Sequence, residues 1–371
     1  MNKLSQYYFA YGSNLNLNDF NQWCVQNHLP DARLIPRGTA LLPDYRLAFS
    51  HKSVSRGGGA LNIEPYVGGV VEGVLFEVDG ADGWQALDRK EGAPRHYERV
   101  TVTVTQESGD TETAVSYINP RVVGQYVKPT DEYVKLVKEG LGSFQLSDRD
   151  LKTTASNRDP RHFTDAVFVY GDLMRGQADS NILRQLGIKY ITSAECFGTL
   201  LLANAELPVL HHPARGSSQP RAYAEGEFVR LNNLNSSLKH LDGFFAGLRP
   251  NIHGFNLTRK IKQVCLGGKK VRWAWVYQTD TRCDQLEVIT SGCWRTHLGE
   301  KDRFWSQLSS QHSPFFNKMT LQTLQRVTPW ETVRSPKTGE SKSHYLTDLL
   351  SKGAIAELRL QQASGFNVAI W

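Results

Sequence analysis

A short strand-forming run that ends in Tyr-Gly occurs twice in this chain, about one domain length apart. The first copy, Tyr7–Leu15, reads YYFAYGSNL, and the second, Val167–Leu173, reads VFVYGDL. Aromatic and β-branched residues favour a strand, and a glycine followed by small polar residues ends it in a loop with exposed backbone N–H groups. A repeat at this spacing predicts two folding units of similar design rather than a short-period solenoid.

The length and composition of the chain agree with two globular domains. Its 371 residues are enough for two cores, and 40% of them are hydrophobic and 22% charged. No apolar run reaches the length of a membrane span, and the first residues lack the pattern of a secretion signal. The five cysteines are scattered and contain no CxxC pair. We therefore expect a cytoplasmic protein with reduced thiols, no membrane partner and no metal site.

The charge of the chain is mildly basic. A net charge of +6 and a pI near 9.0 suit an anionic small molecule as the partner. The sequence contains no long basic run, and its arginines are not interleaved with aromatic residues. We therefore predict no nucleic-acid partner.

Alternating apolar and polar residues predict that the first unit is rich in β-strands. Thr130, followed by two acidic residues before Tyr133, is a helix N-cap signal. Strands that return by hairpins, with few helices, predict a largely antiparallel, barrel-like α+β fold. The predicted strands cover residues 7–11, 45–50, 59–64, 70–78, 99–106 and 112–118, and the predicted helices cover residues 17–26, 84–90 and 130–141.

The motifs of the first unit resemble those of the γ-glutamylcyclotransferase family, including its AIG2-like relatives, in the same order. The resemblance begins with Tyr8–Leu15 and extends through Leu87-Asp88, Glu91-Gly92 and Tyr97 to the helical part near Tyr133. Further matching segments are PDYRLAF at residues 43–49, GGALNI at 58–63 and VVEGVLF at 70–76. The resemblance implies a small mixed β-barrel and a small-molecule γ-glutamyl substrate.

The second unit repeats this order with less fidelity. Residues 224–229 (AEGEFV) parallel residues 71–76, and Leu241-Asp242 parallel Leu87-Asp88. We predict a catalytic domain at residues 1–151, a polar linker at 152–164, a degenerate domain at 165–299 and a C-terminal extension at 300–371. In the extension, helices are predicted at residues 304–308, 321–327 and 345–361. The fold class is thus α+β, with two γ-glutamylcyclotransferase-like barrels in tandem and a C-terminal helical extension.

Glu91 is the candidate catalytic residue. A γ-glutamyl amide cyclises to 5-oxoproline when its own α-amine attacks the γ-carbonyl, so the reaction needs no cofactor and no protein nucleophile. It does need a group that takes a proton from the amine and gives one to the leaving nitrogen. A carboxylate near an apolar wall can do both, and the resemblance implies this role for Glu91. Gly92 allows the turn that presents it.

The candidate substrate-binding residues are Tyr11, Gly12, Ser13, Asn14 and Leu15, with Tyr97 and Tyr133. We expect the backbone N–H groups of Gly12 to Leu15 to face the α-carboxylate or the carbonyl oxygen of the substrate. The resemblance places the two tyrosines in the wall of the site. There a phenol can donate to an oxyanion, and packing in the core is the alternative for each.

The second unit lacks this chemistry. Counting from Leu241-Asp242 puts Phe245 at the position of Glu91, and Asp172 replaces Ser13 in the loop. A phenylalanine carries no proton, and a loop carboxylate repels an anionic substrate. The sequence therefore predicts a catalytic first unit and an accessory second unit. Two other functions stay open, namely γ-glutamyl transfer to an external amine and a non-catalytic tandem module that binds ligands or proteins.

Overall fold

The computed structural model describes residues 7–79, 81–203, 207–212, 222–247, 257–267, 270–279, 286–299, 360–363 and 367–370. The chain divides into two compact units, and the first, residues 1–198 and 210–283, holds two closed barrels. In the part of the chain that is described, no helix combines the length and the apolar character needed to cross a membrane.

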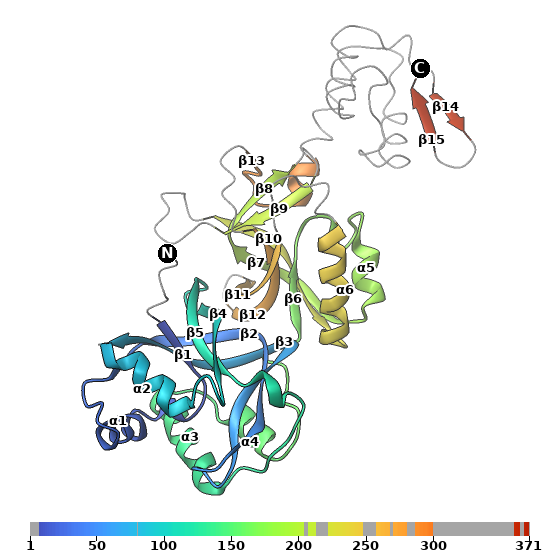
Figure 1. The fold of residues 1–371 in the computed structure, drawn as a ribbon. Coiled ribbons are helices and arrows are strands. Elements are labelled where there is room, and N and C mark those ends of the chain that lie inside the picture. The colour runs from blue at the N-terminus through green and yellow to red at the C-terminus, as the bar shows by residue number, and fades with distance from the viewer. Residues whose placement is uncertain are drawn as a thin grey trace. The chain divides into compact units, whose positions relative to one another are not determined.

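The first barrel has five strands in the order β1-β3-β2-β4-β5 (Figure 1). Neighbouring strands are antiparallel, except that β1 pairs in parallel with β5 and so closes the barrel. The predicted α+β barrel is therefore confirmed. Its strands are β1 (Tyr7–Ala10), β2 (Arg33–Ser53), β3 (Gly58–Asp79), β4 (Glu98–Gln106) and β5 (Thr111–Ile118).

The strands β2 and β3 are much longer than the sequence predicted. The run predicted at 45–50 lies inside β2, and the two runs predicted at 59–64 and 70–78 belong to β3. Their pairing shifts register between Pro36 and Gly38, between Pro43 and Tyr45, and between Ala48 and His51. Such irregularities bend a long strand without ending it. Local composition therefore predicts strand ends at positions where the hydrogen-bonded pairing of the two strands continues.

Two helices of the first barrel begin at residues whose side chains cap them. The helix α1 (Leu17–Gln26) has the predicted bounds, and α2 (Ala81–Glu91) and α3 (Asp131–Ser143) lie close to theirs. The Thr130 side chain accepts a hydrogen bond from the N–H of Tyr133, which confirms the predicted cap. A short helix α4 (Arg149–Ala155) occupies the first residues of the segment predicted as a linker.

The second barrel has strand order β10-β6-β12-β11-β7, and β12 pairs in parallel with β6. The helices α5 and α6 pack through Leu183 and Leu238 on the same apolar cluster as Val167 and Trp275 (Figure 1). The elements are β6 (Ala166–Val169), α5 (Ser180–Gln185), β7 (Ile188–Phe197), β10 (Tyr223–Leu231), α6 (Leu234–Gly247), β11 (Thr258–Leu266) and β12 (Lys270–Gln278).

Equivalent tyrosine hydrogen bonds occur in the two barrels. The Tyr11 hydroxyl donates to the Tyr117 carbonyl at 2.7 Å, and the Tyr170 hydroxyl donates to the Tyr277 carbonyl at 2.8 Å. The tandem repeat predicted from the Tyr-Gly runs is therefore confirmed in three dimensions.

A glycine occupies the same crowded position of each barrel. A Cβ added at Gly73 would lie 2.3 Å from the Ala10 carbonyl oxygen, and one added at Gly226 would lie 2.3 Å from that of Val169. Only a residue without a side chain leaves room for the neighbouring strand.

The substitution Gly226→Ala is expected to lower the free energy of unfolding by roughly 2 to 3 kcal/mol, because the new methyl group meets backbone atoms. The matched control is Gly243→Ala in α6, where an added Cβ meets nothing within 4 Å. This control should be neutral or stabilising, since alanine favours helix. Urea-induced unfolding of both variants measures the difference, and equal midpoints would contradict the steric argument.

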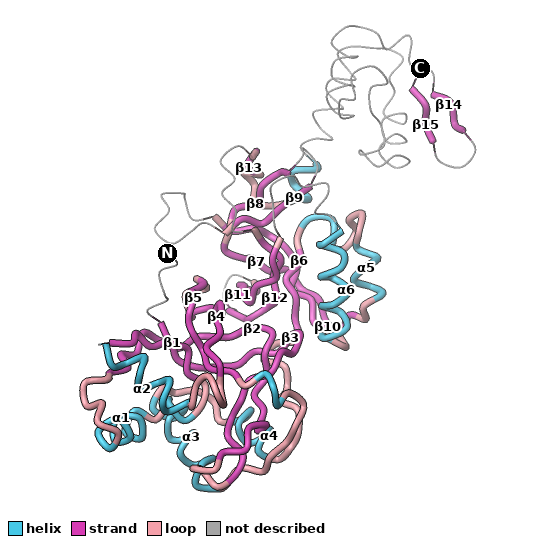
Figure 2. The backbone as a smooth tube through the Cα atoms, in the orientation of Figure 1, coloured by secondary structure: helices cyan, strands magenta, loops and turns pink. Residues whose placement is uncertain are grey.

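The remaining strands form two small sheets (Figure 2). Residues 304–308 and 321–327, predicted as helices, lie outside the described residues. The helix predicted at 345–361 was wrong at its end, because Leu360 and Gln361 belong to a strand; its earlier residues are not described. One sheet has the order β13 (Glu287–Val288), β8 (Thr199–Ala203), β9 (Leu207–His211), and the other pairs β14 (Leu360–Ala363) with β15 (Asn367–Ile370).

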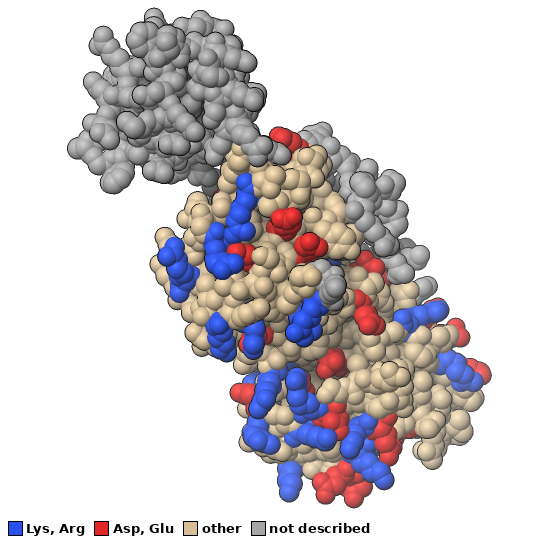
Figure 3. All heavy atoms as spheres, turned by 180° about the vertical axis from the view of Figure 1, so that it is seen from behind, with Lys and Arg blue, Asp and Glu red and all other residues tan. Residues whose placement is uncertain are grey.

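Basic and acidic side chains are interspersed over the face drawn in Figure 3. Surface ion pairs such as Arg37–Glu77 and Arg121–Glu98 join opposite charges. Among the residues that the structure describes, no group of three or more histidine, cysteine, aspartate and glutamate side chains is arranged to hold a metal ion.

Candidate active site

A pocket of about 650 Å³ opens in the first barrel beside the loop that follows β1. Its wall is contributed by the loop, by β2 and β3, by one face of α1, by the end of α2 and by α3. The structure thus brings together side chains that are far apart in sequence. Seven of the eight predicted site residues line this pocket, namely Tyr11, Gly12, Ser13, Asn14, Glu91, Tyr97 and Tyr133.

The eighth predicted residue, Leu15, lies outside the pocket lining. Its side chain is fully buried in the core, and its N–H donates to the Gly12 carbonyl at 3.0 Å. This bond closes a 3₁₀ turn over Ser13–Leu15. The prediction that backbone donors for the substrate extend to Leu15 was therefore wrong. The N–H groups of Gly12, Ser13 and Asn14 remain, because the first N–H groups of such a turn have no acceptor within it.

Glu91 is the last residue of α2, and Gly92 ends the helix with φ of 64°. A Cβ at Gly92 would lie 2.7 Å from Cδ2 of His96, so glycine fits this bend in both conformation and space. The bend places the Glu91 carboxylate against the loop. There its Oε1 accepts a hydrogen bond of 2.7 Å from Nδ2 of Asn14.

The pKa of Glu91 is raised. Burial is the main cause and moves the pKa from an ordinary 4.5 to about 7, while the charge of Lys90 and the hydrogen bond from Asn14 oppose the rise. Near neutral pH the carboxyl group therefore populates both its ionised and its protonated form. A group with this pKa can accept a proton in one step and return it in the next.

The Asn14 side chain connects Glu91 to Tyr8. Asn14 is only 1% exposed, and its Nδ2 lies 3.0 Å from the Tyr8 hydroxyl as well as 2.7 Å from Glu91. Its Oδ1 is buried and accepts no hydrogen bond from any described residue. Since an unsatisfied buried acceptor is costly, this oxygen is suited to an N–H or ammonium group of a ligand.

Sequence reasoning missed Tyr8 and the side-chain role of Asn14. Tyr8 is buried in the core of the barrel and lines the pocket. A signal was available, because one of two adjacent tyrosines in a strand must face the core, and a buried phenol needs a polar partner. No local pattern, however, pairs Asn14 with a residue 77 positions away.

The predicted tyrosines Tyr97 and Tyr133 both contact the backbone of Leu61. The Tyr97 hydroxyl donates to the Leu61 carbonyl at 2.6 Å, whereas the Tyr133 hydroxyl accepts from the Leu61 N–H at 3.4 Å. Burial raises the pKa of Tyr133 to about 12, so its phenol is neutral and keeps its hydrogen. Tyr133 can therefore donate to a ligand oxygen. The Tyr97 and Tyr11 hydroxyls instead donate to backbone carbonyls of the barrel and so have a structural role.

Two cations share one carboxylate at the rim of the pocket. Asp19 lies 2.7 Å from Lys90 Nζ and 3.1 Å from Arg56 NH2. Burial by itself raises the pKa of Asp19, but the hydrogen bonds from Lys90 and Arg56 lower it overall. The rim thus keeps a surplus of positive charge, which favours an anionic ligand.

The second barrel differs from the first at these positions. Phe245 of α6 stacks on the Tyr277 ring with centroids 4.0 Å apart. Asp242, the counterpart of Asp88, binds Arg259 and the Tyr277 hydroxyl, as Asp88 binds Arg99 and the Tyr117 hydroxyl. This network is retained in the second barrel, but Phe245 places a ring where the first barrel has a carboxylate.

The family of the chain follows from comparison with known proteins. The sequence model described as "Gamma-glutamyl cyclotransferase, AIG2-like" matches residues 8–135 and 167–296. The two matches cover more than half of the chain, which therefore belongs to this family and carries two copies of its domain. The resemblance predicted from the sequence is confirmed. A search of curated proteins gave no match.

Several solved structures are similar to parts or most of this chain. One described as a gamma-glutamyl cyclotransferase is 23% identical, with 43% of this chain and 90% of that chain covered and a TM-score of 0.35. An uncharacterized protein from Homo sapiens is 25% identical, and the match covers 43% of this chain and 90% of that chain with a TM-score of 0.34. YkqA from Bacillus subtilis is 14% identical, and the match covers 86% of this chain and 96% of that chain with a TM-score of 0.28.

Proposed function

We propose that the first barrel is a γ-glutamylcyclotransferase that converts a γ-glutamyl amine, amino acid or peptide to 5-oxoproline and a free amine. The observation that carries this proposal is the Glu91 carboxyl group, which has a pKa of about 7 and is hydrogen-bonded to Asn14. It lies beside a loop whose N–H groups are available to an anion. Membership of the family supports the same reaction class.

In the proposed complex, the loop and Asn14 orient the glutamyl group. The N–H groups of Gly12, Ser13 and Asn14 bind a substrate oxygen, and Tyr133 donates to another. The α-amine, which has given the extra proton of its ammonium form to water, donates an N–H to Oδ1 of Asn14 and so satisfies the buried oxygen. This position brings the nitrogen next to Glu91, because the other atom of the same amide, Nδ2, is 2.7 Å from the Glu91 carboxylate.

The reaction then needs one proton to move twice. Ionised Glu91 takes a proton from the α-amine as its lone pair attacks the γ-carbonyl carbon, and the new C–N bond gives a tetrahedral oxyanion. Hydrogen-bond donors around the site stabilise that charge. Glu91 returns the proton to the amide nitrogen, the old C–N bond breaks, and the carbonyl of 5-oxoproline forms. No atom is left on the protein.

Product analysis tests the proposal. The protein is incubated with a panel of γ-glutamyl amines, amino acids and peptides, and 5-oxoproline is measured by mass spectrometry. Release of 5-oxoproline in equal amount to the free amine supports cyclisation. A new γ-glutamyl amide formed with an added amine would instead indicate acyl transfer, and no product with any compound would indicate a binding module.

The proposed roles of the two tyrosines differ, and paired variants separate them. Tyr133→Phe removes a donor that faces the ligand, so kcat/KM should fall about tenfold. Tyr97→Phe removes a hydrogen bond to Leu61, so it should lower the free energy of unfolding by about 1 kcal/mol with a smaller effect on kcat/KM. Steady-state kinetics and urea unfolding of both variants check this; the reverse order of effects would assign the donor to Tyr97.

The proposal also assigns the parts of the chain. Residues 1–151 form the catalytic unit, and residues 165–299 form an accessory unit without a group for proton transfer at Phe245. We place the protein in the cytoplasm, since Cys24, Cys196, Cys265 and Cys293 are free thiols.

A further inference from the structure

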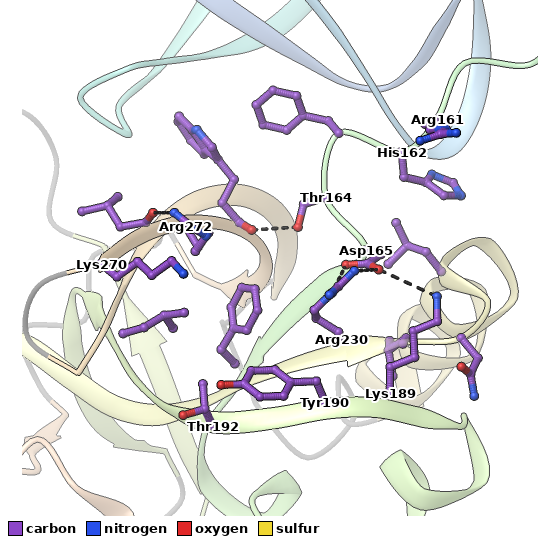
Figure 4. A pocket seen from close by; sticks show the side chains of 18 of the residues that line it. Arg161, His162, Thr164, Asp165, Lys189, Tyr190, Thr192, Arg230, Lys270 and Arg272 are labelled. Atoms are coloured by element: carbon purple, nitrogen blue, oxygen red, sulfur yellow. Dashed lines mark hydrogen bonds and ion pairs between the residues drawn. The ribbon is translucent and has the colours of Figure 1, made fainter.

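A larger pocket, of about 1140 Å³, lies at one end of the second barrel (Figure 4). Its lining includes Thr164 and Asp165, which precede β6, and Lys270 and Arg272 at the start of β12. Because β6 and β12 are parallel, their first residues lie at the same end. The loop at Tyr170, which follows β6 and corresponds to the substrate loop of the first barrel, is at the opposite end. The pocket is therefore not the counterpart of the candidate active site.

Positive charge dominates the lining of this pocket. Five lysine and arginine side chains contribute to it, but Asp165 is its single acidic residue. Arg230 holds that carboxylate with two hydrogen bonds of 2.8 Å, and Lys189 lies 3.8 Å from it. Arg230 lowers the pKa of Asp165, which therefore stays ionised and satisfies one positive charge. The five basic residues are Arg161, Lys189, Arg230, Lys270 and Arg272.

Three of these cations have no acidic partner among the residues that the structure describes. Arg161, Lys270 and Arg272 make no ion pair with a described residue; Arg272 donates to the Val271 carbonyl at 2.8 Å. Three unneutralised cations at one concave surface produce a field that attracts a ligand with more than one negative charge. The guanidinium group of arginine and the ammonium group of lysine also bind phosphate through charge-assisted hydrogen bonds.

Aromatic side chains provide the apolar part of the pocket. Tyr190 is 51% exposed, an unusual exposure for so large a ring, and it lies in the lining together with Thr192. Phe163 and Trp273 also line the pocket, and their rings pack edge to face with centroids 6.0 Å apart. A half-exposed ring among cations suits a ligand that combines a planar ring with anionic groups. The ligand ring can stack on the tyrosine, and its anionic groups can pair with the cations.

We propose that this pocket binds a phosphorylated small molecule with a planar ring, for which a nucleotide is the type compound. Phosphate groups pair with Lys270 and Arg272, which lie on the same side of the pocket in Figure 4, and the ring packs on Tyr190. A small ligand fits better than a nucleic-acid strand, because the five cations line one pocket, whereas basic and acidic residues are interspersed over the face in Figure 3. This proposal does not depend on the reaction proposed for the first barrel.

Calorimetric titration of the full chain tests the proposal with three probes in magnesium-free buffer. ADP carries both the ring and the phosphates, inorganic pyrophosphate carries only the charge, and adenosine carries only the ring. ADP should bind most tightly. The double variant Lys270→Glu, Arg272→Glu should bind ADP and pyrophosphate at least about tenfold more weakly. Tyr190→Ala should weaken ADP binding and leave pyrophosphate binding unchanged.

Two controls locate the effect. Lys239→Glu removes an exposed lysine of α6 outside the pocket and should bind ADP as the wild type does. Glu91→Gln should also bind ADP normally, since it changes the other pocket. No binding of ADP or pyrophosphate to the wild type would overturn the proposal. So would equal ADP binding by the double variant, or tighter binding of an oligonucleotide that depends on the same residues.

Discussion

Replacing Glu91 with glutamine is expected to lower the rate of 5-oxoproline release by about 10² to 10⁴-fold, the range typical of a lost general acid-base. Glutamine keeps the shape of the side chain and can still meet Asn14, but it cannot take a proton from the α-amine. The measurement is kcat/KM with the best compound of the γ-glutamyl panel. Retention of wild-type kcat/KM would remove Glu91 from the mechanism.

The pH dependence of the wild type checks the same assignment. Glu91 must be ionised to act as the base, and its pKa is about 7. We therefore expect kcat/KM to rise with pH through about 7 and to lose most of its value below pH 6. A profile that stays flat between pH 5 and 8 would mean that another group carries the proton.

A stability measurement separates the loss of chemistry from a loss of folding. Burial raises the pKa of Glu91 above its value in the unfolded chain, so the folded state binds more protons between those two values. The contribution of Glu91 to stability is therefore present at low pH and falls as the pH rises from about 4.5 to about 7. The loss is roughly 3 kcal/mol for a shift of this size. Glu91→Gln should remove this loss and be more stable than the wild type at pH 8.

The sequence predicted the parts of the first barrel that depend on local signals. The helix α1 has the predicted bounds, and Thr130 caps α3 as expected, because caps and apolar periodicity act over a few residues. The order of motifs along the chain also pointed to the loop and Glu91, which the structure brings together at one pocket. These features need no knowledge of distant contacts.

Other features depend on contacts between distant residues and were missed for that reason. The helix α4 sits in a segment that looks like a polar linker, yet Leu151 is buried and Thr154 bonds to the Leu47 carbonyl at 3.2 Å. Leu15 was assigned to the substrate because its motif is continuous in sequence, whereas the 3₁₀ turn directs it into the core. The basic pocket of the second barrel combines residues from five segments, none of which is a motif.

The second large effect is expected from Asn14→Ala. Asn14 supplies the hydrogen bond that lowers the pKa of Glu91, and it supplies the buried Oδ1 that is suited to the substrate amine. Its removal should decrease kcat/KM about 10²-fold, since two contacts to reacting groups are lost together. The midpoint of the pH profile should also move to higher pH, because Glu91 loses a donor that favours its ionised form.

The matched control is Asn16→Ala, two residues along the same loop. The Asn16 side chain caps α1 by accepting from the Asp19 N–H at 3.2 Å, and it does not line the pocket. Its loss should cost about 1 kcal/mol of stability and leave the pH midpoint where it is. A shift of the midpoint in Asn14→Ala but not in Asn16→Ala ties the hydrogen bond to proton transfer. Equal shifts, or none, would reduce Asn14 to a structural residue and leave the substrate amine without its proposed acceptor.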